Sequence, residues 1–212
     1  MRAATAPDRN RRRYPATPQE LFRKRLSALL LSALLAGQAA YAAPAPVKFD
    51  GKTFGKEFVG VMEHGNRLKE YVANGESFEN WSRLIGIRYQ EMPQLNNDPA
   101  AMAKALAVTL RQNNPQAKFE ITHNPQQNVA VIDFITWKTG ASNDGTMEIN
   151  AFKYWQSADK KGLYSLQLAQ RVRTADYKDQ QKAVQALKNI RSSLLKQIRS
   201  ANHQAVEKAL QR

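Results

Sequence analysis

Short segments of alternating apolar and polar residues dominate the chain after residue 55. Arg67–Ala73 and Arg83–Gln90 alternate with a period of two, which is typical of strands with one covered face, and Lys56–Glu63 has the composition of an extended segment. Four further segments have strand composition: Lys118–His123, Val129–Trp137, Thr146–Trp155 and Leu163–Arg173. The connections between them are short, which favours antiparallel neighbours because a parallel pair needs a long crossover.

Two segments have the helical period instead. The first begins at Asp98-Pro99, a favoured cap followed by a favoured first helical residue, and places Met102, Leu106 and Leu110 four residues apart. The second is a long amphipathic helix from about Asp179 to Leu210. Together these elements predict an α+β fold in which an antiparallel sheet of about five to seven strands packs against two helices.

The most apolar run of the chain, Leu26–Ala36, lies before this pattern begins. Basic residues Arg23–Arg25 precede it and Ala40-Tyr41-Ala42 follows it, which is the order expected of a secretory signal peptide. A retained membrane anchor is the alternative, but the run is shorter than the roughly 20 residues that cross a hydrocarbon layer of about 30 Å. We therefore expect a signal peptide over residues 1–42 with cleavage between Ala42 and Ala43. An extended linker over residues 43–55 and a single domain over 56–212 should follow.

Composition changes this picture in two respects. Removal of residues 1–42 takes away eight Lys/Arg and two Asp/Glu, so the formal charge falls from +14 to +8. The chain has no cysteine, which excludes disulfides, thiol catalysis, thiolate metal sites and a lipoprotein anchor. We expect a periplasmic or secreted protein that leaves the cytoplasm by the general secretory route.

Three segments carry a resemblance to a known group of proteins. They read YVANGESFENWSRL from Tyr71, VIDFITW from Val131 and GLYSLQLAQR from Gly162. The chain resembles a group of small exported bacterial proteins of unknown function marked by an E-N-W turn and a late S-L-Q strand. Its element order is also similar to that of PsbP-like α/β sandwiches, a looser likeness at the level of fold. The resemblance implies a periplasmic or secreted bacterial protein and brings no catalytic residues with it.

Two features suggest contact with a partner. Trp81 is either an exposed aromatic residue that binds a ligand or a residue that fills the sheet edge, and the second interpretation is favoured. Lys188, Arg191 and Arg199 belong to a basic amphipathic helix, which can bind an anionic membrane or envelope surface. The alternative is a solvated helix face that keeps the protein soluble, which the modest, alanine-rich apolar stripe favours.

Catalytic chemistry has little support in the sequence. The three histidines, His64, His123 and His203, lack the spacing of a metal site, and no nucleophile elbow or phosphate loop occurs. Asp133 and Glu148 lie in adjacent predicted strands, where paired carboxylates could serve as acid and base or could simply be outward polar positions. We therefore assign no catalytic, cofactor-binding or metal-binding residues.

These observations leave three functional hypotheses. The first is an exported, non-enzymatic binding or accessory domain of the cell envelope with an unknown protein or ligand as partner. The second is a module that docks on anionic envelope surfaces through its basic C-terminal helix. The third is an enzyme whose site forms only in the fold. Nucleic acid is not an expected partner outside the cytoplasm.

Overall fold

The computed structural model of the protein describes residues 47–49, 52–61, 65–137 and 144–211. The chain divides into two compact units, residues 1–37 and residues 38–212, and all described residues lie in the second. The predicted signal peptide and its cleavage site at Ala42 and Ala43 lie outside the described residues, as does His64.

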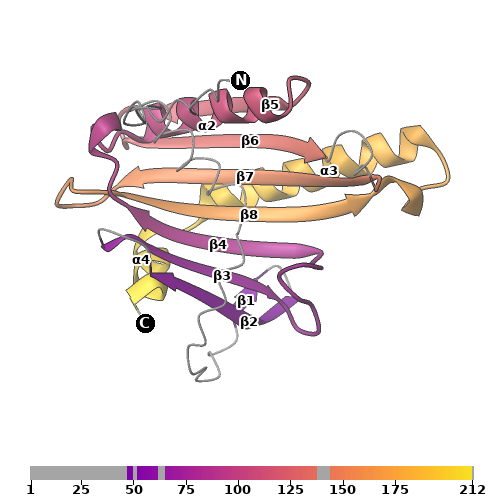
Figure 1. The fold of residues 1–212 in the computed structure, drawn as a ribbon, viewed down its shortest axis with the longest axis horizontal. Coiled ribbons are helices and arrows are strands. Elements are labelled where there is room, and N and C mark those ends of the chain that lie inside the picture. The colour runs from indigo at the N-terminus through magenta and orange to yellow at the C-terminus, as the bar shows by residue number, and fades with distance from the viewer. Residues whose placement is uncertain (1–46, 50–51, 62–64, 138–143, 212) are drawn as a thin grey trace, which may run out of the picture. The chain divides into compact units, whose positions relative to one another are not determined.

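Eight strands form one antiparallel sheet in the order β1-β2-β3-β4-β8-β7-β6-β5 (Figure 1). Their bounds are β1 Val47–Phe49, β2 Lys52–Val61, β3 Arg67–Ala73, β4 Arg83–Gln90, β5 Lys118–Asn124, β6 Val129–Trp137, β7 Thr146–Gln156 and β8 Leu163–Arg173. The α+β class and the antiparallel sheet are confirmed. The strand beyond the predicted five to seven is β1, whose three residues are too few to show an alternating pattern. β1 and the first residues of β2 lie inside the segment 43–55 that was predicted to be a linker.

The sheet consists of two runs of neighbouring strands that meet at β4 and β8. After β4, a 3-10 turn (Pro93–Leu95) and α2 (Pro99–Asn113) carry the chain to the far edge, where β5 begins. β8 then returns beside β4, in a register that runs from Arg83 opposite Gln170 to Gln90 opposite Leu163. As predicted, Asp98 caps α2, and its carboxylate accepts hydrogen bonds from the backbone N–H groups of Ala100 and Ala101 at 2.6 and 2.9 Å.

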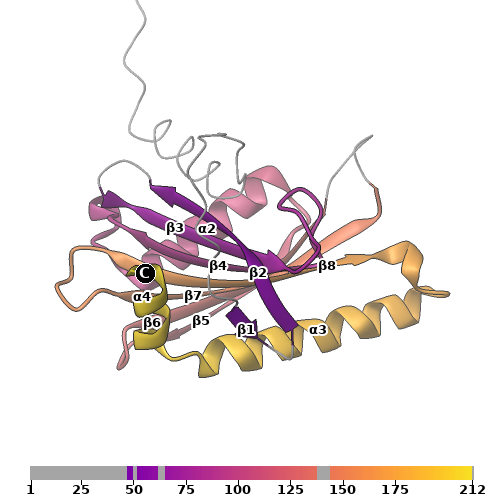
Figure 2. The same ribbon diagram turned by 90° about the horizontal axis from the view of Figure 1, so that it is seen from below.

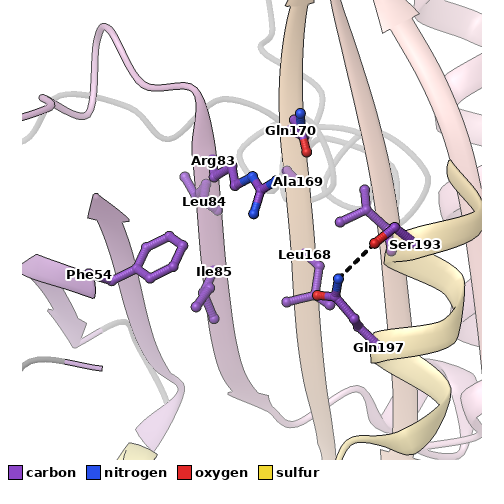
Figure 3. A pocket seen from close by; sticks show the side chains of 10 residues that line it. Phe54, Arg83, Leu84, Ile85, Leu168, Ala169, Gln170, Ser193 and Gln197 are labelled. Atoms are coloured by element: carbon purple, nitrogen blue, oxygen red, sulfur yellow. Dashed lines mark hydrogen bonds between the residues drawn. The ribbon is translucent and has the colours of Figure 1, made fainter. Parts of the chain in front are cut away.

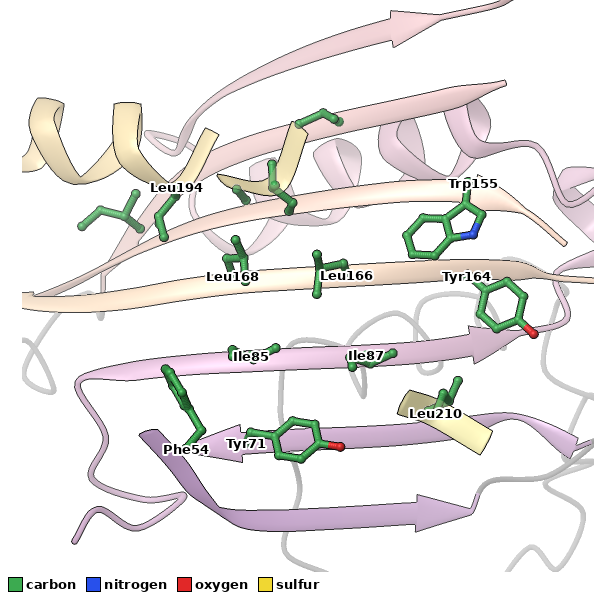
Figure 4. Packing of buried hydrophobic residues seen from close by; sticks show 14 of the residues in the cluster. Phe54, Tyr71, Ile85, Ile87, Trp155, Tyr164, Leu166, Leu168, Leu194 and Leu210 are labelled. Carbon is green, nitrogen blue, oxygen red and sulfur yellow. The ribbon is translucent and has the colours of Figure 1, made fainter. Parts of the chain in front are cut away.

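The helices cover opposite faces of the sheet, as Figure 2 shows. α2 packs against β5, β6 and β7 on one face, here called the α2 face. α3 (Gln180–Ser200) and α4 (His203–Gln211) pack on the other, the α3 face, after a 3-10 turn at Thr174–Asp176. The main apolar core lies under α3 and α4 (Figure 4) and includes Phe54, Ile85, Trp155, Leu166, Leu168, Leu194, Ile198 and Leu210. Because each strand alternates, its other residues point to the α2 face.

The apolar stripe predicted for one long C-terminal helix continues across two helices. Ala201 is extended, with φ −62° and ψ 131°, and ends α3. The side-chain oxygen of Asn202 then accepts a hydrogen bond from the backbone N–H of Ala205 at 3.0 Å, as an N-cap does. The turn redirects the chain, so that α4 lies over β3 and β4 while α3 lies over β6, β7 and β8.

Candidate functional site

Trp81 lies in a packed position rather than on an open surface. Its side chain is 7% exposed and packs with Val72, Leu84 and Ala169 on the α2 face. The guanidinium of Arg171 covers the indole ring at 3.8 Å from the ring centroid. The turn before Trp81 is held by its neighbours: the carboxylate of Glu76 accepts hydrogen bonds from the backbone N–H and the hydroxyl of Ser82. The structure therefore favours packing over ligand binding for Trp81, although the side chain covers the inner strands β3, β4 and β8 and not the sheet edge.

A network of polar side chains, buried at its centre and partly exposed at Glu148 and Arg171, crosses four strands of the α2 face. It contains Glu70, Arg88, Gln167, Asn150, Glu148 and Arg171. The guanidinium of Arg88 bonds Glu70 at 2.9 Å and Gln167 at 2.8 Å, and Gln167 donates to Asn150 at 2.8 Å. At the Arg88–Glu70 ion pair the two side chains are 5% and 3% exposed. The side chains of the network hydrogen-bond to one another and so connect β3, β4, β8 and β7. Donors and acceptors that are paired in this way are not available to bind a ligand.

The suggested pairing of Asp133 with Glu148 does not occur. Asp133 stands opposite Ala151 and Glu148 opposite Thr136, so the two carboxylates point to opposite faces of the sheet. Glu148 binds Arg171 at 3.3 Å in the polar network, and Asp133 binds Arg191. Within the described part of the chain, no group of three or more His, Asp or Glu side chains is arranged to hold a metal ion.

Arg191 turns inward from α3 toward the sheet. Its Nε donates to Asp133 Oδ1, and its Nη2 donates to Asp133 Oδ2 at 2.9 Å and to Glu120 Oε2 at 2.6 Å. Hydrogen bonding to Asp133 raises the pKa of Arg191 above its ordinary value, and Glu120 adds to the effect. Of the three predicted partner-binding cations, Arg191 is thus engaged within the protein.

Lys188 and Arg199 are exposed on the outer side of α3. Lys182 and Lys196 are exposed on the same helix, and we call these four residues the α3 basic face. No Asp or Glu occurs between Gln180 and Ser200. The carboxylate of Asp179, at the helix cap, lies 3.7 Å from Lys182, but both groups are well solvated, with exposures of 49% and 69%. No helix among the described residues is long and apolar enough to span a membrane.

The junction of α3 and α4 rests on the end of β7. The ammonium of Lys153 donates to the carbonyl oxygens of Arg199 and Ala201 at 3.2 and 3.0 Å, which places a cation at the negative end of α3. Burial lowers the pKa of Lys153. Next to it, Trp155 stacks on His203 with 4.4 Å between ring centroids. Burial, and secondly the charge of Lys153, lowers the pKa of His203.

A small cavity lies between α3 and the strands β4 and β8 (Figure 3). Its volume is about 20 Å³, and Leu168, Ile85 and Gln197 are among the residues that line it. Gln197 donates to the Ser193 hydroxyl at 2.8 Å within α3. A space of this size holds about one water molecule, so it is a packing defect rather than a ligand site.

Comparison with known proteins identifies a family for the chain. A protein-family model matches residues 41–203, which is more than half of the sequence. No curated protein and no solved structure matches the chain. The protein therefore belongs to the family that this model describes, which is an uncharacterised family.

Proposed function

We propose that the protein is an exported, non-enzymatic accessory protein of the bacterial cell envelope that docks on an anionic membrane surface through the α3 basic face. The observation that carries the proposal is that one cation of α3 forms ion pairs within the protein while four others are exposed to solvent. Arg191 is neutralised by Asp133 and Glu120, whereas Lys182, Lys188, Lys196 and Arg199 are exposed on a helix with no acidic residue of its own. Such a surface is complementary to anionic lipid headgroups.

The expected affinity is low. Each Lys or Arg near an anionic leaflet contributes about 1 kcal/mol, so four of them supply about 4 kcal/mol. The buried stripe of α3, which includes Leu194 and Ile198, faces the sheet and is not available to enter the lipid. Docking should therefore be electrostatic, reversible and sensitive to salt, because exposed charges are screened over about 10 Å at 0.1 M.

Export rests on the segment before the described residues. The basic, apolar and small-residue order of residues 23–42 supports a cleavable signal. The resemblance to small exported bacterial proteins with an E-N-W turn rests on segments within Tyr71–Arg173 and supports export independently of the family match. The looser likeness to PsbP-like sandwiches rests on the order of the elements alone. The protein recovered from the periplasm or medium should begin at Ala43. Recovery with Leu26–Ala36 still attached would overturn this part of the proposal.

Vesicle sedimentation tests the docking. The exported protein should bind phosphatidylcholine vesicles that contain phosphatidylglycerol, should not bind vesicles of phosphatidylcholine alone, and should be released as salt rises. The substitutions Lys182→Gln, Lys188→Gln, Lys196→Gln and Arg199→Gln, combined, should abolish binding.

A matched control removes the same charge from exposed cations elsewhere, namely Lys104, Lys160, Lys161 and Arg173. This control should still bind. Equal loss in both variants would mean that net charge, and not the α3 basic face, drives association. Binding to the vesicles that does not weaken as salt rises would contradict electrostatic docking.

A further inference from the structure

The two edges of the sheet differ in how well they are closed. At one edge, β1 pairs with Lys52–Phe54, and a register shift between Phe54 and Lys56 interrupts the regular pairing of β2. A short edge strand and a bulge both limit further strand pairing, as is common at the edges of natural sheets. At the other edge, β5 is the last strand (Figure 1), and its pairing with β6 is regular from Lys118 to Asn124. The β5 edge is therefore the more open of the two.

The outer side of β5 presents free backbone groups. In an antiparallel pair, alternate residues of the edge strand point their N–H and C=O groups away from the neighbouring strand. Among the residues that the structure describes, no other segment forms a backbone hydrogen bond with these groups of β5. No proline or bulge interrupts the strand. Such an edge is a template for one more strand.

A second copy of β5 fits this edge in one register. Antiparallel pairing about a two-fold axis at Ile121 brings the whole strand into the ladder, with these residues opposite one another: Ile121 and its own copy, Phe119 and His123, Glu120 and Thr122, Lys118 and Asn124. No like charges stand opposite each other in this arrangement. An axis at Glu120 would place two carboxylates opposite each other, which is destabilising. An axis at Thr122 would leave Lys118 and Phe119 without partners.

The side chains of β5 are compatible with this pairing. Glu120 is bound by Arg191 of α3, with 2.6 Å between Oε2 and Nη2. The two copies of Lys118 would lie at opposite ends of the paired strands, roughly 20 Å apart at the usual rise per residue. Phe119 and Ile121 share the face that α2 covers and are only partly buried in a single copy. Pairing would cover more of both, since residues that stand opposite each other on one face are in contact.

We infer that two copies of this protein pair through their β5 strands into a closed dimer, in which the sheet of one copy continues into the other. The same edge is used by both copies, so the assembly stops at two. Stable complexes bury about 1,200–2,000 Å² in total, and one strand pair is a small interface by that measure, so we expect a dissociation constant of about 10–100 μM. The α3 basic face has no residue in β5, so the pairing is independent of the proposed docking.

Cysteine cross-linking tests both the dimer and its register, because the chain has no cysteine of its own. Ile121→Cys should form a disulfide-linked dimer under oxidising conditions, since residues that stand opposite each other lie about 4.5–5.5 Å apart. Lys118→Cys is the matched control in the same strand and should cross-link far more slowly, because its two copies lie beyond disulfide reach. A mixture of Lys118→Cys and Asn124→Cys should cross-link, since these two positions stand opposite each other.

Analytical ultracentrifugation over a concentration series measures the affinity. Thr122 is exposed and would stand opposite Glu120 of the second copy. Thr122→Glu would create two like-charge pairs and should raise the dissociation constant about twofold to thirtyfold. Thr122→Lys would create two opposite-charge pairs and should lower it. Gln185→Glu, at an exposed position of α3, is the control for added charge and should leave it unchanged.

Three results would overturn the inference. The first is a protein that stays monomeric at about 1 mM, or that cross-links equally well as Ile121→Cys and as Lys118→Cys. The second is an open-ended oligomer, in which the β5 edge would bind a different surface of the next copy. The third is protection of the β5 amides from hydrogen exchange only after an envelope extract is added, which would assign the edge to another protein. Circular dichroism would verify that each variant is folded.

Discussion

Arg191 of α3 binds both carboxylate oxygens of Asp133 in β6, and the same guanidinium reaches Glu120 in the edge strand β5. Asp133 is 7% exposed at its side chain, whereas Arg191 is 36% exposed. A fork of parallel hydrogen bonds fixes orientation as well as distance, so this contact sets how α3 lies on the sheet. It also determines which side of α3 points outward and carries the remaining cations.

Replacement of Arg191 by methionine should therefore destabilise the fold although the residue lies near the surface. The carboxylate of Asp133, which is nearly buried, would lose the guanidinium that neutralises it. A fully buried pair broken in this way costs about 3–5 kcal/mol, and the solvent around Arg191 reduces the expected loss to about 1–3 kcal/mol. Urea unfolding of Arg191→Met would measure it.

Arg199→Met is the control for this experiment, because Arg199 is an exposed cation of the same helix. Its free energy of unfolding should stay within about 0.5 kcal/mol of the parent protein. Equal effects of the two substitutions would mean that the ion pair with Asp133 contributes nothing particular.

Local pattern was sufficient to predict most of the elements. The predicted bounds of β3, β4, β6 and β8 coincide with the observed ones because each of these strands alternates or is bounded by clear turn residues. The end of α3 was not predicted, since Ala201 and Ala205 continue the apolar stripe while Asn202 begins a new helix. Asn202, a residue type that favours helix N-caps, was the one sign in the sequence that a new helix begins there.

The side-chain contacts could not be predicted, because they depend on which strands are neighbours and in which register they pair, and the local sequence pattern does not specify either. Glu70, Arg88 and Gln167 each look like an ordinary polar position of an alternating strand. Only the pairing of β3 with β4 and of β4 with β8 brings them together on the α2 face. For the same reason Arg191 could not be separated from its exposed neighbours on α3.

The buried polar network should be the most sensitive polar feature of the fold. Arg88→Met would leave the carboxylate of Glu70, 3% exposed, without its guanidinium, and would remove a donor to Gln167. We expect a loss of about 3–5 kcal/mol in the free energy of unfolding, measured by urea denaturation.

The double variant Arg88→Met, Glu70→Gln should be less damaging than the sum of the two single variants, because the second change removes the carboxylate charge that Arg88 had compensated. Arg173→Met, at an exposed position at the end of β8, serves as the control and should be nearly neutral. Additive losses at positions 88 and 70 would contradict the ion-pair explanation.

The capping of α2 offers a smaller and more local test. Asp98→Ala removes the acceptor of two backbone N–H groups and should lower the free energy of unfolding by about 1 kcal/mol. Asp98→Ser keeps an N-cap oxygen and should recover most of that loss. If serine were no better than alanine, the carboxylate would be acting by another route than the two hydrogen bonds.

His203 should make the protein less stable in mild acid. Its ring stacks on Trp155 of β7 and faces the ammonium of Lys153, while Glu207 of α4 lies nearby and accepts a hydrogen bond from Trp155 Nε1 at 2.8 Å. Burial and Lys153 lower the pKa of His203 below its ordinary 6.5, and Glu207 only partly opposes them. As the pH falls below 6.5, the unfolded chain therefore takes up a proton that the folded protein does not, and the free energy of unfolding falls.

The slope cannot exceed about 1.4 kcal/mol per pH unit for one proton, and solvent at the half-buried ring keeps it below that value. Urea unfolding of the parent protein and of His203→Phe, compared from neutral pH down to pH of about 5, would isolate this contribution, since phenylalanine keeps a ring against Trp155 but cannot titrate. The parent should lose stability over this range by more than the variant does. Parallel curves for the two proteins would show that other groups account for any acid sensitivity. A steeper fall in His203→Phe would contradict a lowered pKa of His203 in the folded protein.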